Sequence, residues 1–547
     1  MSQKKVLVII PRWDLSRHSE LPTFSYMFPL GIPYICAALK SNCIQYDVLN
    51  LNHSSGRDTD VIRKKIKTGS YSIVATGANS KYLNELNCLL MAVKQCSSEI
   101  VTILGGIIIT TEPELVMNVI HPDYGIYGDG EMAFPRLIQN IRSGFDENIQ
   151  GVLRWNPDNS LNIDMLSLSE QPLDLDLLPF PDFESCGFRE WLDNTPANNP
   201  FYFHTGTLDF PRTYPIMGSR GCPYSCTFCF HTNKYQERSL DSLFDELETA
   251  IPKFNINLVF LYDDCFLHKH DRAFDFCDRF QSLRDKIGRD VYFAIQGIVS
   301  AVNEKILLRL KEVGCISMSY GFESYDEDVL KSMHKPITPA QIDFAYKLTR
   351  KCGMNVQATF IFGDSAETTS TYKNTLEYWK DNCTDQVGLA VIIPYPNSAI
   401  YQKCLSKGII ADKLTYLRDE LPSGMQKNFT DTMDDIQYRK MSSDVRYFSR
   451  RYVKYAPAEI CPSSKMKGRY TAKVNCPWCR QVCTIDNMET QGGVIEKIFG
   501  VIATVTCKHC LSHIRLTGKN HYLYLACIII DEVIPNSVRL LKRRLKV

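Results

Sequence analysis

The sequence predicts an α/β protein with two successive parallel-sheet domains, followed by a helical segment and a small metal-binding module. Short apolar runs alternate with helical patterns over residues 1–150, as expected of a doubly wound parallel sheet. Six further apolar runs follow over residues 211–410, each closed by polar residues, glycine or proline, which indicates a curled parallel sheet. Two C-x2-C pairs near the carboxyl end predict the metal-binding module.

The composition is that of an ordinary globular protein, and its length corresponds to roughly three to four domains. The chain has 547 residues, of which 44% are hydrophobic and 22% charged, and its formal net charge is +1. This balance creates no overall field for nucleic acid or an anionic membrane, so neither is an expected partner. The longest apolar runs, such as residues 523–530, are too short to span a bilayer.

The cysteines and the first residues together indicate a cytoplasmic protein. The chain contains 21 cysteines, and its start lacks the apolar core and small-residue cleavage site of a signal peptide. Cysteines in a reducing compartment are metal ligands or free thiols more often than disulfides. We therefore expect metal sites, in a compartment that would also protect an oxygen-sensitive cluster.

The first domain, residues 1–150, has strands that read as continuous apolar runs buried on both faces. These runs are residues 6–10, 46–51, 72–76 and 100–104. Ligands of doubly wound sheets bind where the loops leave the carboxyl ends of the strands. Two such loops are rich in glycine, one with Gly105 and Gly106 and the other with Gly128, Asp129, Gly130 and Glu131.

Residues 151–210 form a predicted linker between the two domains. Residues 174–182 are punctuated by proline and aspartate and show no sustained period. Residues 194–200 are polar with two prolines, and we expect a surface loop there. The aromatic side chains of this stretch, among them Trp155 and Trp191, are expected to pack at an interface rather than to bind substrate.

The core, residues 211–410, begins with three cysteines at a C-x3-C-x2-C spacing. Cys222, Cys226 and Cys229 follow two glycines on a loop that a proline also bends. Thiolates this close together converge on one point, as the soft ligands of an iron–sulfur cluster must. A cubane has four irons, so either a distant cysteine such as Cys265 or Cys277 supplies the fourth ligand, or one iron stays open.

Acidic and small polar residues follow several strands of the core. Asp263 and Asp264 end one apolar run, Glu323 and Ser324 follow another, and Gly363 closes a third. Two adjacent acids repel each other and are unfavourable without a cation, which favours a ligand role for the aspartates. The alternative is that these side chains cap the helices that follow.

The rest of the chain is predicted to be a helical bridge, residues 411–470, and a ribbon module, residues 471–547. Two C-x2-C pairs with strands between them favour a structural zinc site with four sulfur ligands. An auxiliary iron–sulfur cluster and uncoordinated thiols are the alternatives, and Cys483 is close enough in sequence to replace one ligand. Residues 538–547 are basic and read as a solvated helix end. The four predicted ligands are Cys476, Cys479, Cys507 and Cys510.

The cysteine loop resembles the cluster motif of the radical S-adenosylmethionine (SAM) enzymes, including the aromatic Phe228 before the last cysteine. The resemblance implies a partial (β/α)6 barrel and a [4Fe-4S] cluster on three cysteines, whose open iron binds SAM and cleaves it to a 5′-deoxyadenosyl radical. It also implies that Asp263 and Asp264 meet the amino group of SAM. Further contacts to SAM are implied for Glu323, Ser324 and Gly363.

The first domain resembles the Rossmann-like cobalamin (B12)-binding domain that precedes many radical SAM cores. The matching residues are Gly105, Gly106, Gly128, Gly130 and Glu131. Family members often carry a histidine where this chain has Ile108, so the resemblance implies a base-off cobalamin held by backbone and apolar contacts. An α/β domain that has lost its cofactor is the alternative, because fold alone does not fix a ligand.

The combined resemblance, which covers about residues 1–410, implies a cobalamin-dependent methyltransferase that methylates an unactivated carbon. The alternative is a radical SAM cyclase, oxidase or rearrangement enzyme of the same architecture without methyl transfer. Both imply a small-molecule or peptide substrate and a reductant such as flavodoxin or ferredoxin. No feature of the sequence names the substrate.

Overall fold

The structure is a computed structural model that describes residues 5–13, 22–145, 148–162, 174–202, 207–230, 234–490 and 501–518. The apolar run 523–530 and the basic stretch 538–547 lie outside the described residues. The chain divides into two compact units. The first comprises Met1–Asn194, Pro215–Thr249 and Ile393–Lys427, and the second Thr195–Tyr214, Ala250–Ile392 and Asn428–Val547. Among the described residues, no helix has the length and apolar character needed to cross a membrane.

The first unit contains a six-stranded sheet in the order β2-β1-β3-β4-β5-β6. Pairing is parallel except for the edge strand β6, which runs antiparallel to β5. The order reverses direction between β1 and β3, which is where doubly wound sheets bind ligands. The strands are β1 Lys5–Ile10, β2 Tyr46–Asn50, β3 Tyr71–Gly77, β4 Val101–Gly105, β5 Tyr124–Ile126 and β6 Val152–Arg154.

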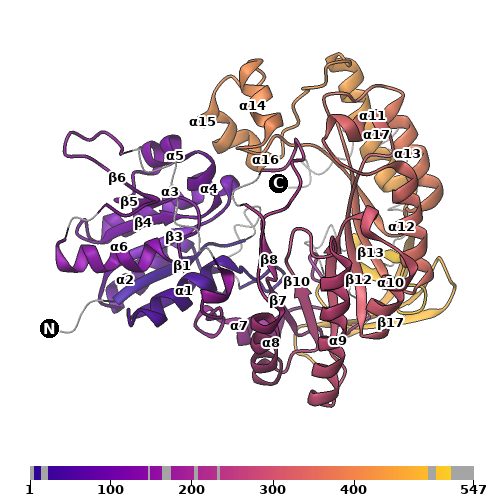
Figure 1. Ribbon diagram of the computed structural model, residues 1–547, viewed down its shortest axis with the longest axis horizontal. Coiled ribbons are helices and arrows are strands. Elements are labelled where there is room, and N and C mark those ends of the chain that lie inside the picture. Colours follow the sequence, from indigo (N-terminus) through magenta and orange to yellow (C-terminus); the bar gives the residue numbers. More distant parts are fainter. Residues whose placement is uncertain are drawn as a thin grey trace. The chain divides into compact units, whose positions relative to one another are not determined.

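Helices cover both sides of this sheet (Figure 1). Helix α1 packs against α6, while α3 packs against α2 and α5. Right-handed crossovers place these two groups on opposite faces, since the chain moves one way from β1 to β2 and the other way afterwards. The helices are α1 Gly31–Ser41, α2 Asp58–Thr68, α3 Leu83–Cys96, α4 Ile107–Thr111, α5 Pro113–Ile120 and α6 Ala133–Ser143.

The linker contains more regular structure than the sequence predicts. It supplies strand β6 and helix α7 (Phe188–Asn194), and Trp191 is fully buried. Its ring stacks on Phe188 with centroids 5.7 Å apart and lies 5.4 Å from Phe28. Packing of apolar rings therefore fixes this segment on the first unit, as expected for aromatic residues that bury large areas.

The expectation of a surface loop over residues 194–200 is wrong. Thr195, Ala197, Asn198 and Asn199 are all buried. Thr195, Ala197 and Asn198 hydrogen-bond to strand β17 (Val482–Met488) or to Glu489 directly after it, as in the bond from the Ala197 N–H to the Asn487 carbonyl at 2.9 Å. Polar residues and prolines predict a turn here, but tertiary hydrogen bonds have buried it.

The second unit holds most of a six-stranded sheet in the order β14-β13-β12-β11-β10-β7, an open partial barrel as predicted. The pairs from β10 to β14 are parallel, and Figure 1 shows α10, α12 and α13 beside these strands. The strands are β7 Thr213–Ile216, β10 Leu258–Leu261, β11 Tyr292–Gly297, β12 Cys315–Glu323, β13 Asn355–Phe362 and β14 Val387–Val391.

Each of the six predicted apolar runs of the core overlaps one of these strands. The helices between and after them are α8 Leu240–Phe254, α9 His270–Ile287, α10 Glu304–Glu312, α11 Glu327–Ser332, α12 Pro339–Lys351, α13 Thr371–Asn382 and α14 Ala399–Ser406. Three more lie in or beside the predicted bridge, α15 Lys413–Thr415, α16 Leu421–Ser423 and α17 Asp435–Arg451.

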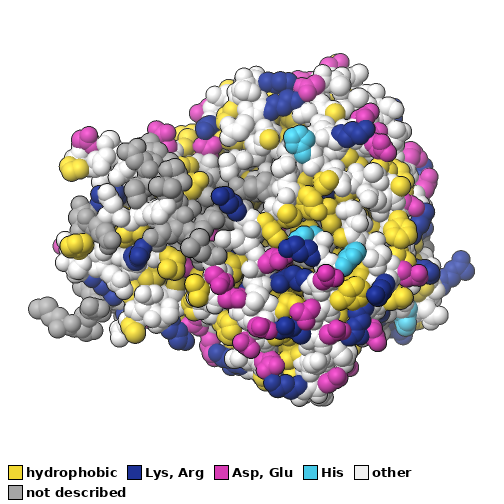
Figure 2. Space-filling model, in the orientation of Figure 1, with side chains coloured by type: hydrophobic (Ala, Val, Ile, Leu, Met, Phe, Trp, Pro, Cys, Tyr) yellow, Lys and Arg dark blue, Asp and Glu magenta, His cyan; other side chains and the backbone are white. Residues whose placement is uncertain are grey.

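A five-stranded sheet in the order β17-β16-β15-β19-β18 completes the second unit. All pairs are antiparallel except β15 with β19. Its strands are β15 Tyr455–Pro462, β16 Tyr470–Asn475, β17 Val482–Met488, β18 Val501–Thr506 and β19 His513–Thr517. On the face of the molecule in Figure 2, basic and acidic side chains are interspersed, in keeping with the net charge of +1.

Candidate functional site

A cavity of about 550 Å³ lies at the carboxyl ends of β1, β3, β4 and β5 in the first unit. Its walls are mostly apolar, and they include Ile10, Ala75, Ile103 and Ile126 from the strands. The cavity therefore occupies the edge and the switch point at which a doubly wound sheet binds its ligand. All five residues proposed from the sequence line it, namely Gly105, Gly106, Gly128, Gly130 and Glu131.

The glycines of the cavity have two different roles. A side chain on Gly77 would place its Cβ 2.6 Å from the Gly105 carbonyl oxygen, so this close approach requires glycine at position 77. Gly106 has φ of 85°, a backbone conformation that favours glycine. A Cβ on Gly105 would instead meet no atom within 4 Å. Any larger side chain on Gly105 would enter the open space, which is the arrangement expected where a large ligand lies against backbone.

Thr110 ties the two glycine loops together. Its hydroxyl donates to the Gly106 carbonyl at 3.1 Å and accepts from the Gly128 N–H at 3.0 Å. No histidine is among the described residues that line the cavity, and Ile108 is fully buried in α4. This apolar, glycine-lined cavity fits a base-off cobalamin held by backbone and apolar contacts.

A buried ion-pair group joins the cavity wall to the cysteine loop. Arg220, on strand β8 (Ser219–Arg220), donates to Asp129 Oδ2 at 2.8 Å and to Glu131 Oε1 at 2.6 Å. The side chains of Arg220 and Glu131 are only 8% and 7% exposed. Burial opposes the charged form, but the charges of Glu131 and Asp129 outweigh it and raise the pKa of Arg220.

Arg220 is a site residue that could not be identified from the sequence. Its only signal was a charged residue within a loop of small residues directly before Gly221 and Cys222. Asp129 lies in a predicted binding loop but was not itself proposed as a site residue. The two partners are 91 and 89 residues away from Arg220, so neither local pattern nor spacing could pair them.

The cysteine loop leaves the sheet at β8 and returns at β9 (Gln236–Glu237), which pairs antiparallel with β8. Gly221 has φ of 71°, which lets the chain turn directly before the first cysteine. The Cys229 N–H donates to the Cys226 carbonyl at 3.2 Å and closes a turn. Phe228 lies within this turn and is half-buried. Cys226 is buried, while Cys222 and Cys229 are partly exposed.

A second contact joins the loop to the rim of the cavity. Phe230 stacks on Tyr395 with centroids 5.6 Å apart, and the Lys81 ammonium lies 5.6 Å from the centre of the same Tyr395 ring. Lys81 belongs to a short 3-10 helix, Ser80–Tyr82, whose neighbour Asn79 lines the cavity. The chain therefore supports the loop from two sides, by charge at Arg220 and by aromatic packing at Tyr395.

The two candidate aspartates lie in the second unit directly after β10. Asp263 is buried, whereas Asp264 is exposed and its carbonyl accepts from Gln296 Nε2 at 2.8 Å. The alternative that these acids cap the next helix is wrong, because α9 begins at His270 after an N-cap at Lys269.

Glu323 and Ser324 close strand β12 in an unusual backbone conformation. Glu323 has φ of 59°, and its carboxylate pairs with the Lys335 ammonium at 3.0 Å. Ser324 is buried, and its hydroxyl lies 3.5 Å from Thr375 Oγ1. Neither residue caps α11, whose N-cap is Asp326. A non-glycine residue rarely adopts this left-handed conformation, so the surrounding structure must hold Glu323 in it.

Gly363 follows β13 in a turn that Glu367 holds in place. Gly363 has φ of 97°, and its N–H donates to Glu367 Oε2 at 3.2 Å. The Thr371 hydroxyl donates to the other carboxylate oxygen at 2.6 Å. Burial is the main reason that the pKa of Glu367 rises to about 7.

The two alternative cluster ligands are ordinary buried thiols in their surroundings. Cys265 is 3% exposed, and Cys277 is fully buried on α9 among apolar side chains. Burial raises the pKa of Cys277 to about 12, so this thiol stays protonated where it lies. In contrast, the structure brings the ligand atoms of the four C-terminal cysteines to within 4.8 Å of one another.

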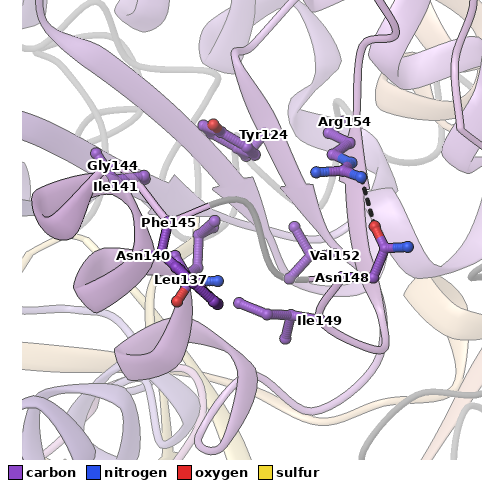
Figure 3. Close-up of a pocket in the computed structure, with 10 residues that line it drawn as sticks. All are labelled: Tyr124, Leu137, Asn140, Ile141, Gly144, Phe145, Asn148, Ile149, Val152 and Arg154. Carbon is purple, nitrogen blue, oxygen red and sulfur yellow. Dashed lines mark hydrogen bonds between the residues drawn. The ribbon is translucent and has the colours of Figure 1, made fainter.

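A smaller cavity of about 270 Å³ lies at the opposite edge of the first sheet (Figure 3). Its walls come from the start of β5, the end of α6 and strand β6, and Arg154 hydrogen-bonds Asn148 across it. Doubly wound sheets bind ligands at the other ends of their strands, so this cavity is not part of the candidate site.

Comparison with known families agrees with this description. A B12 binding domain model matches residues 23–138, and a radical SAM superfamily model matches residues 216–378. The chain is 25% identical over 432 residues to an uncharacterized methyltransferase of Pyrococcus horikoshii, covering 75% of this chain and 85% of that protein. It is also 25% identical over 462 residues to the anaerobic magnesium-protoporphyrin IX monomethyl ester cyclase of Rubrivivax gelatinosus, covering 82% and 78%.

The fold is similar to a solved structure of the radical S-adenosylmethionine methyltransferase TsrM from Kitasatospora setae with cobalamin and a [4Fe-4S] cluster bound. The TM-score is 0.57 at 16% identity, and the match covers 73% of this chain and 75% of that one. This likeness concerns the order of the two α/β domains. Neither family model extends into the C-terminal ribbon.

Proposed function

Because this chain belongs to the radical SAM enzymes that carry a B12-binding domain, we propose that it catalyses a cobalamin-dependent C-methylation of an unactivated carbon. Support comes mainly from one contact, the buried bridge from Arg220 to Asp129 and Glu131. It fastens the wall of the cobalamin cavity to the loop of the cluster ligands. An enzyme that uses both groups on one substrate needs such a fixed connection.

The residues have separate roles in this proposal. Cys222, Cys226 and Cys229 would bind three irons of a [4Fe-4S] cluster, which would leave its fourth iron to SAM. The glycine loops and the apolar wall hold cobalamin by close backbone approach and exclude water. When bound, the cluster supplies the electron that cleaves SAM, and cobalamin carries the methyl group. Exclusion of water matters because a carbon radical must reach the methyl donor before it is quenched.

Contacts to SAM are proposed for residues at the strand ends of the barrel. The Asp263 carboxylate, buried after β10, would accept from the SAM ammonium, and Asp264 lies beside it. Glu323, already held by Lys335, would orient the ribose or the methionine part. Contacts to SAM or the cluster are also proposed for the Gly363 turn and for Phe228, which directly precedes Cys229 in the sequence. Ser324 is the weakest member, since its hydroxyl faces Thr375.

A radical SAM cyclase, oxidase or rearrangement enzyme is the second candidate, and one observation favours it. The similar Rubrivivax gelatinosus protein is named a cyclase, and its alignment covers most of both chains. Both candidates act on a small molecule or peptide and receive electrons from a reductant such as flavodoxin or ferredoxin. Zinc at the four C-terminal cysteines would be structural and take no part in either reaction.

The products of SAM distinguish the two candidates. The chain is purified anaerobically with iron, sulfide and cobalamin, and both SAM products are quantified after reduction. Methyl transfer predicts S-adenosylhomocysteine together with 5′-deoxyadenosine when a substrate library is supplied, whereas the second candidate predicts 5′-deoxyadenosine alone. If a chain that holds a full cluster cleaves no SAM, both proposals fail.

A variant tests the cobalamin site separately. Gly105→Leu would fill space that is open next to the cavity, and we expect it to bind cobalamin at least about tenfold more weakly. The control is Gly388→Ala on the exposed side of β14, where a Cβ would meet Thr359 only at 3.4 Å. Equal cobalamin retention by both variants would contradict the assignment of the cavity.

A further inference from the structure

The C-terminal ribbon brings four thiols together outside both regions that the family models match. Cys476 Sγ lies 3.7 Å from Cys510 Sγ, and Cys479 Sγ lies 3.8 Å from Cys507 Sγ. All four sulfurs are within 4.8 Å of one another. Each close pair joins one cysteine of each C-x2-C motif, so the two motifs interlock around one centre.

The two cysteine turns have the same backbone geometry. In the first, the Arg480 N–H donates to the Cys476 carbonyl and the Cys476 N–H donates to the Gln481 carbonyl, both at 2.9 Å. In the second, the corresponding bonds join Leu511 to Cys507 and Cys507 to Ser512, again at 2.9 Å.

The equivalent residues of the two turns also share a rare conformation. Arg480 and Leu511, each four places after the first cysteine of its turn, both have φ of 63°. Side chains such as leucine rarely adopt this left-handed region. The two turns share this strained conformation, and their cysteine sulfurs lie close together. This arrangement indicates a binding site for a ligand of the four sulfurs.

The sulfur spacing selects the class of metal. Zn–S bonds of about 2.3 Å in a tetrahedron place the sulfurs about 3.8 Å apart, which is the observed spacing of the closest pairs. In a cubane cluster each thiolate binds a different iron and points outward, so its sulfurs lie farther apart.

We propose that Cys476, Cys479, Cys507 and Cys510 bind one zinc ion in a closed tetrahedral site, and that the zinc-bound turn at residues 507–512 clamps both edges of the partial barrel. Binding exchanges the four thiol protons for Zn²⁺, and no electron is transferred. With all four positions taken by protein, the ion has no place for substrate. Cys483 contacts this group through a 3.5 Å bond from the Lys508 N–H but is not one of the ligands.

One edge of the barrel, β14, is held through Asp385 and Gln386, the two residues before it. The Asp385 carbonyl accepts from the His513 N–H at 2.8 Å, and its carboxylate accepts from Ser512 Oγ at 2.8 Å. Gln386 donates from Nε2 to the Leu511 carbonyl at 2.6 Å and accepts at Oε1 from the Val356 N–H of β13 at 2.7 Å.

Helix α12 adds a third contact at this edge. Arg350 donates to the Cys510 carbonyl at 2.8 Å and to the Asp385 carboxylate at 3.2 Å. The Tyr346 hydroxyl donates to the other oxygen of Asp385 at 2.7 Å. The cysteine turn is therefore continuous with a hydrogen-bonded network of strand and helix.

The other edge strand, β7, is held through the residues that lead into it. Lys508, between the two cysteines of the second turn, pairs with Asp209 at 2.7 Å. Asp209 also accepts from the Asp486 N–H at 3.1 Å. Asn198 exchanges two hydrogen bonds with the backbone of Glu489, at 2.8 and 2.9 Å. An open parallel sheet has two unprotected edges. The ribbon contacts the segment before each edge strand, β14 and β7.

Metal analysis tests the first half of the proposal. The full chain is purified without added metal, and zinc and iron are counted in wild type, Cys507→Ser, the exposed control Cys461→Ser, and Cys226→Ala. We expect one zinc per chain in all but Cys507→Ser, and no iron in Cys226→Ala. Cobalt substituted into the wild-type chain should give the intense near-ultraviolet bands of a tetrahedral tetrathiolate. Iron retained by Cys226→Ala, or wild type without zinc, would overturn the zinc site.

Hydrogen exchange tests the clamp. Removal of zinc by a chelator should speed exchange at least tenfold at both residues 197–202 and residues 385–391, and leave the central strand β11 unchanged. Asp385→Asn, which keeps all four cysteines, should retain zinc and speed exchange only at residues 385–391. If zinc removal changes neither edge, or only one, the ribbon does not clamp the barrel. The Asp385→Asn measurement tests the clamp even if the cysteine variants do not fold, because this variant keeps all four cysteines.

Discussion

The cysteine loop at residues 218–230 and the cysteine turns of the ribbon are two sulfur sites with different support. The ribbon sulfurs lie on two matching turns, each closed by its own backbone bonds at 2.9 Å. The cluster loop is also held by side chains from distant parts of the chain, Arg220 through Asp129 and Glu131, and Phe230 through Tyr395.

This difference agrees with the roles proposed for the two sites, a structural zinc site in the ribbon and a reactive cluster at the loop. Four thiolates on locally closed turns fill every coordination position of a metal, which suits stability. Three thiolates on a loop held from a distance leave one position for a ligand, and the same distant residues can line the site where that ligand reacts. Whether local backbone bonds or distant side chains hold the ligands of a metal site is therefore a guide to its role, in addition to the number of ligands.

The largest expected effects are the loss of SAM cleavage in a variant of the cluster loop and the loss of zinc in a variant of the ribbon. Cys226→Ala should reduce SAM cleavage to the level without enzyme, because the cluster loses one of its three ligands, and should leave the zinc content unchanged. Cys507→Ser should abolish zinc binding and lower the melting temperature while the iron content stays. Product analysis, metal counts and thermal unfolding measure these effects. The exposed Cys88→Ser is the control, and a loss of zinc in Cys226→Ala would break the comparison.

The second prediction tests the long-range support at Arg220. Arg220→Met leaves the buried Glu131 carboxylate and the partly exposed Asp129 carboxylate without this partner. Loss of one member of a buried pair is unfavourable by about 3–5 kcal/mol. Because Asp129 and Glu131 line the cavity, cobalamin affinity should also fall at least about tenfold. Thermal unfolding and titration with cobalamin, followed by absorption, measure the two effects.

A matched pair elsewhere in the same unit provides the control. Arg238 pairs with Glu246 at 2.6 Å, with side chains 4% and 2% exposed, and neither residue lines the cavity. Arg238→Met should destabilise the unit by a similar amount and leave cobalamin affinity within about twofold. Equal loss of cobalamin affinity in both variants would show that Arg220 acts only through stability.

Much of the fold could be predicted because its signals are local. Strand β13 (residues 355–362) ends directly before Gly363, the residue predicted to close it, since a buried apolar run ends at a glycine that must turn. Strand β6 and helix α7 have only three and seven residues and show no period long enough to detect. The burial of residues 195–199 depends on strand β17, nearly three hundred residues later, and no local pattern contains it.

The candidate site divides in the same way. The cysteines and glycine loops could be found from spacing, because their chemistry requires neighbours in sequence. The group of Arg220, Asp129 and Glu131 could not, since a single sequence does not say which of many charged residues meet in space. Lys335, which pairs with Glu323, was missed for that reason as well.

The third prediction concerns Glu367, which accepts a hydrogen bond from the Gly363 N–H four residues earlier. This support is local, like the backbone hydrogen bonds that close the ribbon turns. Burial raises its pKa to about 7, against about 4.5 for an ordinary glutamate. Between these values the folded chain holds a proton that the unfolded chain has lost, so stability falls as pH rises through this window, by up to about 3 kcal/mol. Glu367→Gln should remove this fall.

Denaturant unfolding of the cluster-free chain at pH 5, 6, 7 and 8 measures this effect. The wild type and Glu367→Gln should differ progressively more in stability as the pH increases, with the variant the more stable at pH 8. Glu377→Gln, an exposed substitution on helix α13, is the control and should follow the wild type. Parallel profiles for wild type and Glu367→Gln would mean that this carboxyl is already ionised at pH 5.

The smallest expected effect is at Tyr395, the second long-range support of the cluster loop. An aromatic pair contributes about 0.5–1.5 kcal/mol beyond its buried area, and the Lys81 ammonium adds less than about 1 kcal/mol at a partly exposed ring. Tyr395→Leu should therefore retain the iron content of wild type and reduce SAM cleavage by less than about tenfold. Tyr395→Phe keeps the ring and should match wild type. A complete loss of iron in Tyr395→Leu would mean that aromatic packing, rather than the charge group at Arg220, is the main support of the loop.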